Sequence, residues 1–117
     1  METICPLKLV NEIIGGKWKQ SIICILEDGK PARYNEIRRK IPDITNMMLA
    51  QSLKKLEEYG IIRRTQYNEM PVRVEYTLTR EGQSLLPILN SINQWGKEYI
   101  QQHEQYQSQC ETCHLAK

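Results

Sequence analysis

The chain has 117 residues, 40% of them hydrophobic and 26% charged, which is enough to form one domain with its own core without disulfides or metals. It contains no run of about 18 apolar residues and no signal peptide, so we expect a globular cytoplasmic protein that is not inserted in a membrane. The net charge is only +2, but residues 30 to 80 carry eleven basic against six acidic side chains, which predicts either a polyanion-binding surface or a basic, solvated face.

The first two predicted elements are helices. Pro6 follows Cys5 at the start of the first helix, and Gly15 marks its end. This helix is apolar on two sides, so one side can pack on its own domain while the other needs a second partner. The two sides are formed by Leu7, Val10 and Ile14 and by Leu9 and Ile13. The second helix is predicted from Lys17 to about Asp28, with Trp18 in the core.

The next two predicted elements form a helix-turn-helix. The segment 34–41 reads as a short helix closed by Pro42. In the second helix of the pair, Thr45 is a good N-cap residue and Gly60 a C-terminal stop. A buried stripe of leucines lies between them, formed by Leu49, Leu53 and Leu56. Two helices joined by a tight turn are typical of this motif.

Two strands and a long helix complete the predicted order. In the segment 72–78, Val72, Val74, Tyr76 and Leu78 alternate with polar residues, which predicts a strand with one face on the core. Residues 61–67 supply its antiparallel neighbour. Thr79 then caps a last helix that Pro87 should kink. Its apolar stripe extends beyond what the domain can cover, and consists of Leu85, Leu89, Ile92, Trp95, Tyr99 and Tyr106.

This order of elements is that of a winged helix-turn-helix, a mainly α fold with a small β-hairpin (α+β), in which the hairpin is the wing. We expect a single domain over residues 1–107, including N- and C-terminal dimerisation helices, and a flexible cysteine-containing tail over 108–117. The major groove of duplex DNA admits one helix, so the polar face opposite the leucines predicts recognition of DNA, with Gln51 as the base reader. The arginines outside this helix would hold the phosphate backbone. The predicted DNA-binding residues are Arg33, Arg38, Arg39, Thr45, Asn46, Met47, Ala50, Gln51, Lys54, Arg63, Arg64 and Arg73.

Several segments resemble the HxlR-type family of bacterial, MarR-like transcription regulators. They are IGGKW (14–18), RYNEIRRKIP (33–42), ITNMMLAQSLKKLEEYGII (44–62), YNEMPVRVEYTLTREG (67–82), and LLPIL with WG (85–96). The resemblance implies a homodimer whose first and last helices form the interface and whose recognition helices enter successive major grooves. The chain departs from the family at Met47 and near Ser52, where members often carry a basic residue.

The four cysteines are expected to be free thiols rather than a disulfide framework. Cys5, at the start of the first helix, should have a lowered pKa because the helix dipole and Lys8 both favour the thiolate. The resemblance implies that such a cysteine can respond to oxidants or electrophiles. Cys110 or Cys113 of the partner subunit would be the resolving thiol if the last helix folds back across the dimer; an inert Cys5 is the alternative. Cys24 is expected to be a packed core residue.

The tail sequence CETCH keeps another alternative open. Cys110, Cys113 and His114 with one outside ligand could bind zinc, whereas haem attachment would require export. The segment GGK lacks the spacing of a phosphate-binding loop, and the two histidines, His103 and His114, have no evident nucleophile or carboxylate pair beside them. We therefore expect that the protein is not an enzyme and has no cofactor and no bound metal. The competing functions are a DNA-binding regulator, a thiol-redox or zinc-binding protein, and a winged helix that binds only protein.

Overall fold

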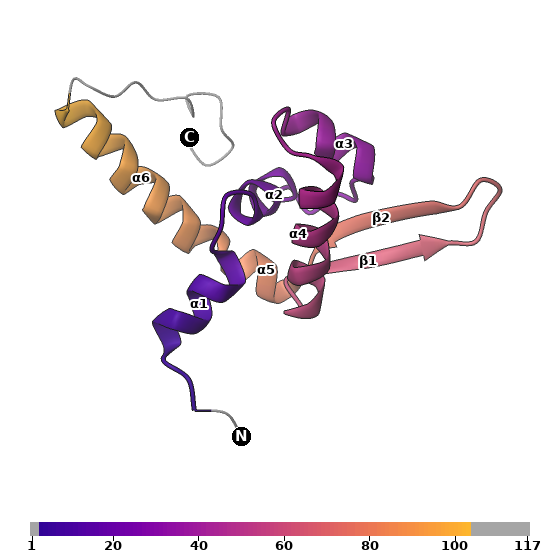
Figure 1. Ribbon diagram of the computed structural model, residues 1–117, viewed down its shortest axis with the longest axis horizontal. Helices are drawn as coiled ribbons and strands as arrows, with labels where there is room; N and C mark the ends of the chain where they lie inside the picture. The colour runs from indigo at the N-terminus through magenta and orange to yellow at the C-terminus, as the bar shows by residue number, and fades with distance from the viewer. Residues whose placement is uncertain (1–2, 104–117) are drawn as a thin grey trace.

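The computed structural model describes residues 3–103, and Figure 1 shows their arrangement. Six helices and two strands follow the predicted order, except that two helices stand in place of the single predicted last helix. They are α1 (Pro6–Ile14), α2 (Lys19–Ile25), α3 (Tyr34–Lys40), α4 (Asn46–Glu58), β1 (Ile62–Tyr67), β2 (Arg73–Leu78), α5 (Arg80–Ser84) and α6 (Leu86–Gln102). The winged helix-turn-helix prediction is therefore confirmed: α3 and α4 are the helix pair, and the hairpin extends away from them as the wing.

The core lies where α2, α3, α4 and the base of the hairpin meet. The leucine stripe predicted for the second helix of the pair is buried, as Leu49, Leu53 and Leu56 are each at most 2% exposed. Ile22 of α2 and Ile37 of α3 are fully buried in the same cluster. Burying a side chain of this size stabilises the fold by about 1.5–3 kcal/mol, so this cluster fixes the position of α4.

The second helix is shorter than predicted. It spans Lys19–Ile25 because the chain tightens at its end, where the amide of Glu27 bonds to the carbonyl of Cys24 instead of continuing the helical pattern. Lys17 and Trp18 precede the helix, and Trp18 is only partly buried against the core. Cys24 is buried, as predicted.

Hydrogen bonds hold the N-terminal end of α4. The Thr45 Oγ1 accepts a hydrogen bond from the backbone amide of Met48 at 3.1 Å, which confirms the predicted N-cap. From α3, the hydroxyl of Tyr34 donates to the carbonyl oxygen of Asn46 at 3.0 Å. The Tyr34 hydrogen bond thus links α3 to the N-terminal end of α4.

The hairpin pairs Ile62 with Leu78 at its base and Tyr67 with Arg73 near its tip. Ala32 extends the base, since it exchanges backbone hydrogen bonds with Tyr76 at 3.0 and 2.8 Å. Tyr76 and Leu78 are buried as predicted, but Val72 is not part of the strand and is 58% exposed. The prediction was wrong there because β2 begins at Arg73, after the turn, beyond the reach of the core.

A threonine and a glycine join the wing to the last helices. Thr79 Oγ1 accepts from the amide of Gly82 at 3.1 Å, which confirms the predicted cap, and its hydroxyl donates to the carbonyl of Ile61 at 3.0 Å. Gly82 lies so close to Ile61, the residue before β1, that a Cβ would be 2.2 Å from the Ile61 carbonyl oxygen. Only glycine fits at this crossing.

The predicted single, kinked last helix is instead two helices. α5 ends at Ser84 and α6 begins at Leu86, with Pro87 in its first turn, where the missing amide of proline costs no helical hydrogen bond. α6 runs away from the body of the molecule (Figure 1). Beyond Leu89, the predicted stripe is exposed at Ile92, Trp95 and Tyr99, as are Leu7 and Val10 of α1, while Tyr106 lies outside the described residues. No helix in the described part of the chain is long and apolar enough to cross a lipid bilayer.

Candidate nucleic-acid interface

The face of α4 opposite the buried leucines is open to solvent. Met47 is 69% exposed, and Ala50, Gln51 and Lys54 are also exposed. These side chains are the ones predicted to face DNA, and α4 presents them together because they recur at helical spacing on one side. A helix with its side chains is about 10–12 Å across and the major groove about 12 Å wide, so this face has the right dimensions to enter the groove.

Thr45 and Asn46, also predicted to contact DNA, have structural roles at the start of α4. The Thr45 hydroxyl oxygen is the N-cap acceptor. The side-chain oxygen of Asn46 lies 3.3 Å from the Tyr34 hydroxyl, which also bonds the Asn46 carbonyl. Both residues are exposed, so their remaining hydrogen-bonding groups face solvent.

Three predicted arginines belong to α3 and its N-cap. Arg33 is exposed at the N-cap, where its backbone amide donates to Glu36 Oε1 at 3.2 Å. Arg38 and Arg39 are exposed in the last turn and, with Asn35 and Pro42, line an open hollow of about 630 Å³. The structure therefore separates Arg33 from the Arg38–Arg39 pair by the length of this helix.

Arg63 and Arg64 lie on β1 and are both exposed. Successive side chains of a strand point to opposite faces, so Arg64 shares a face with Tyr76, opposite it on β2, and Arg63 shares the other face with Thr77. The Arg64 Nη2 donates to Gln66 Oε1 at 3.3 Å, a contact that leaves its charge uncompensated. The hairpin thus carries one of these two cations on each of its faces.

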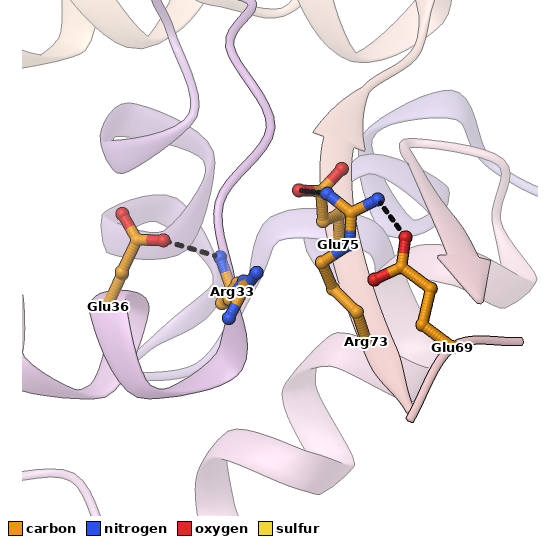
Figure 2. A network of polar contacts seen from close by, with 5 residues as sticks. All are labelled: Arg33, Glu36, Glu69, Arg73 and Glu75. Carbon is orange, nitrogen blue, oxygen red and sulfur yellow. Dashed lines mark hydrogen bonds and ion pairs between the residues drawn. The ribbon is translucent and has the colours of Figure 1, made fainter. Parts of the chain in front are cut away.

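Arg73 is bound within the wing. Figure 2 shows its guanidinium between two carboxylates: Nη2 lies 3.0 Å from Glu69 Oε1 and Nη1 lies 3.1 Å from Glu75 Oε2. The same guanidinium stacks over the ring of Tyr67, its cross-strand neighbour, at 4.0 Å from the centroid. The side chain is only 27% exposed. Unlike Arg63 and Arg64, Arg73 has its positive charge balanced locally, which the sequence pattern did not indicate.

Sequence reasoning missed a second basic hollow, on the flank of α4. Its lysines come from two places in the chain: Lys17 just before α2 with Lys19 at the first position of α2, and Lys54 with Lys55 on α4. Only Lys54 was predicted as a site residue. No motif marks the set, since residues 1–29 carry a slightly negative net charge and folding alone brings these lysines together.

Cys5 is an exposed thiol at the N-cap of α1. Its sulfur makes no capping hydrogen bond of standard geometry, but the backbone amides of Lys8 and then Leu7 interact with it and hold the pKa of the Cys5 thiol below its usual value. Slight desolvation acts in the opposite direction. The predicted direction is confirmed, and the cause is the amides of the first turn rather than the Lys8 ammonium group.

The other predicted thiol site cannot be placed, because Cys110, Cys113 and His114 lie outside the described residues. Within residues 3–103, no cluster of three His, Cys, Asp or Glu side chains is suited to hold a metal ion.

Comparison with known proteins adds the family context. Residues 13–104 match the model of the HxlR-like helix-turn-helix family. An uncharacterized HTH-type transcriptional regulator of Methanothermobacter thermautotrophicus is 48% identical over 98 residues, covering 84% of this chain and 74% of the relative.

Two redox-related structures are also similar. The redox regulator HypR in its oxidized form is 41% identical, with a TM-score of 0.74, over 80% of this chain and 96% of that one. The reduced form of the transcriptional regulator YodB from Bacillus subtilis is 34% identical, with a TM-score of 0.74, over 86% and 99% of the two chains. YodB has also been solved after diamide treatment and with a quinone bound.

Proposed function

Because the chain belongs to the HxlR-like helix-turn-helix family of transcriptional regulators, we propose that it binds a specific operator as a cytoplasmic homodimer. The observation that carries the proposal is the exposed polar face of α4, whose width fits the major groove of DNA. Basic residues of α3 and of the wing lie on either side of it. Gln51 at its centre is the base reader, since a glutamine side chain can bind the N6 and N7 of adenine with two hydrogen bonds. Met47, Ala50 and Lys54 contact the neighbouring base edges and sugars.

Phosphate contacts would come from both flanks of α4. Arg33, Arg38 and Arg39 lie on α3 and its N-cap, and Arg63 and Arg64 lie on the wing. Thr45 and Asn46, at the start of α4, would reach the DNA backbone with their remaining hydrogen-bonding groups. If about four of these side chains contact phosphates in each subunit, log K should fall with log salt at a slope of about −7.

The exposed apolar residues of α1 and α6 support a dimer. They are Leu7, Val10, Ile88, Ile92, Trp95 and Tyr99, and each is at least 37% exposed in the single chain. On α6, Ile88, Ile92, Trp95 and Tyr99 recur at the spacing of one helix face, and an exposed apolar face of this kind marks protein–protein contacts. A two-fold dimer presents two identical α4 helices, which requires an inverted repeat with half-sites about 34 Å apart.

Cys5 supplies a means of regulation. It is exposed, its pKa is lowered, and it precedes α1, whose outer face belongs to the proposed dimer interface. Its thiolate can add to a quinone, forming a C–S bond, or join a second thiol in a disulfide while diamide takes up two electrons and two protons. The second thiol would be Cys110 or Cys113 of the partner subunit. The states in which HypR and YodB were solved support this choice of signals.

Selection of bound fragments from random duplex DNA tests the DNA-binding part. We expect an inverted repeat, and Gln51→Ala should lose discrimination at one base position per half-site at a cost of about 1–3 kcal/mol. Failure of the parent protein to enrich any sequence would contradict the proposal.

The regulatory part is tested with the selected operator. Diamide or a quinone should release the parent protein from DNA and leave Cys5→Ser bound. Equal loss of binding in both proteins, or no loss in the parent, would exclude Cys5 as the sensor without affecting the DNA-binding proposal.

A further inference from the structure

The basic hollow on the flank of α4 has a volume of about 490 Å³ and joins two separate parts of the chain. One wall is the linker before α2, with Lys17 and Trp18, followed by Lys19 in the first turn of that helix. The other wall is one side of α4, where Met48 and Lys55 stand beside the buried Ser52. Gln51 and Lys54, at the edge of the hollow, belong also to the face proposed to enter the major groove.

The charge in this hollow is strongly positive and available. Four lysines line it against one acid, Glu58, which pairs with Lys55 at 3.6 Å while both side chains are about half exposed. Lys17 Nζ lies 4.7 Å above the Trp18 ring, and Lys19 Nζ donates to the carbonyl oxygen of Glu12 at 2.8 Å. Among residues 3–103, neither of these two ammonium groups forms an ion pair with a carboxylate.

The position of the hollow determines what can reach it. A helix about 10–12 Å across that occupies a groove about 12 Å wide has a sugar-phosphate strand along each flank. The wing follows α4 in the chain and carries Arg63 and Arg64, whereas the hollow opens on the side of α4 that faces the linker before α2. A phosphate strand lying on that side would meet the lysines of the hollow.

We propose that this hollow is a binding site for the DNA phosphate backbone, with Lys17 and Lys19 as contacts and Trp18 as its apolar wall. The inference rests on the proposed entry of α4 into the major groove. An ammonium group on a flexible four-carbon stem can follow a phosphate over several ångströms, so the two lysines can leave their present weak contacts at little cost. These contacts do not discriminate between base sequences and instead fix how deeply α4 lies in the major groove.

The test compares two double variants under reducing conditions on the operator selected by the parent protein. Lys17→Gln with Lys19→Gln removes the two proposed contacts. Lys8→Gln with Lys30→Gln makes the same change in charge at exposed lysines that do not line the hollow. For a dimer, the first pair should flatten the slope of log K against log salt by about 3 to 4 and lower affinity at least about tenfold at 0.1 M salt, without changing base preference. The control pair should change the slope little.

A second measurement does not depend on these substitutions. The chain has two tryptophans, so Trp95→Phe leaves Trp18 as the only one. Because Trp95 belongs to the proposed dimer interface, the measurement uses this variant only after its operator affinity is shown to equal that of the parent. Addition of operator DNA should quench or shift the Trp18 emission, because a phosphate strand would displace Lys17 from above the ring.

The outcomes separate the two proposals. If the parent binds no duplex DNA, the proposed function itself fails. If the parent binds its operator but both double variants show the same salt slope, or the Trp18 emission does not respond to saturating operator, only the phosphate site in the hollow is overturned.

Discussion

At the scale of single residues, the partners of a cation decide what it can bind. Arg64 is exposed and has an uncompensated charge, while Arg73 lies between Glu69 and Glu75 and over Tyr67. To bind a phosphate, Arg73 would have to give up two carboxylates and a ring. Its contacts instead tie the turn that carries Glu69 to β2, so we assign Arg73 to the stiffness of the wing.

Arg73→Ala should therefore weaken binding to all sequences modestly while leaving the salt slope nearly unchanged, and should speed amide hydrogen exchange in residues 67–73. Arg64→Ala should flatten the slope by about 1 per subunit. Arg73→Lys should not restore the parent exchange rates, because one ammonium cannot pair with both carboxylates and stack on Tyr67 as a planar guanidinium does. If Arg73→Ala and Arg64→Ala flatten the slope of log K against log salt equally, Arg73 is a phosphate contact after all.

The rate at which the Cys5 thiol is alkylated should depend on pH in a way that α1 determines. The amides of Lys8 and Leu7 favour its thiolate, so the thiolate fraction, and with it the rate of alkylation, should rise at lower pH than for a free cysteine, whose pKa is about 8.5. Iodoacetamide kinetics in a variant with the other three cysteines replaced would measure this. The same variant unfolded in urea is the control, since unfolding removes the ordered amides. Equal midpoints in the folded and unfolded protein would show that α1 does not activate the thiol.

At the scale of elements, the crossing between β1 and α5 orients the last helices. Thr79 caps α5 and bonds back to the end of the α4–β1 connection, and Gly82 allows the close approach to Ile61. Because α6 follows α5 after one residue, the direction of α6 depends on this contact.

Gly82→Ala should destabilise the protein by about 1–3 kcal/mol, since the added methyl would overlap the Ile61 carbonyl and approach the Leu78 side chain. Each kcal/mol lowers Tm by about 4–8 °C in a domain near this size. Gln83→Ala, at the next and exposed position of α5, is the control and should change Tm little. Matching Tm values for the two variants would mean that the backbones separate easily at the crossing.

At the scale of the whole molecule, α1 and α6 lie outside the winged helix (Figure 1). They expose apolar side chains that the domain does not cover. Stable protein interfaces bury about 1,200–2,000 Å², so a dimer must use much of this surface at once. In that arrangement, Cys5 at the start of α1 can influence the distance between two α4 helices, and therefore the fit to two half-sites.

Ile92→Glu should convert the proposed dimer to a monomer in sedimentation and reduce operator affinity to that of a half-site, because a charge would be buried in the interface. Met70→Glu is the control for sedimentation: Met70 is 99% exposed, in the turn of the wing. A parent protein that sediments as a monomer at micromolar concentration would rule out the dimer.

Much of the fold follows from local signals in the chain. Thr45 and Thr79 have the hydroxyl that caps a helix, and the leucines at 49, 53 and 56 repeat at the spacing of one helix face, so each acts within a few residues of its own position. The same local reasoning predicted too long a second helix, a continuous last helix and a strand that included Val72. Element ends depend on which residues the core reaches, which nearby sequence does not encode.

The sequence by itself determined the order of elements, the polar face of α4 and the cysteine at the start of α1, because capping, periodicity and helix-end electrostatics operate over a single turn or a strand repeat. Only the tertiary structure decided which cations are available. It balanced Arg73 with Glu69 and Glu75 around the hairpin turn, and it brought Lys17 and Lys19 to the flank of α4, about 30 positions away in the chain. The physical reason is that the strength of a charge depends on its neighbours within a few ångströms, and those neighbours are chosen by packing.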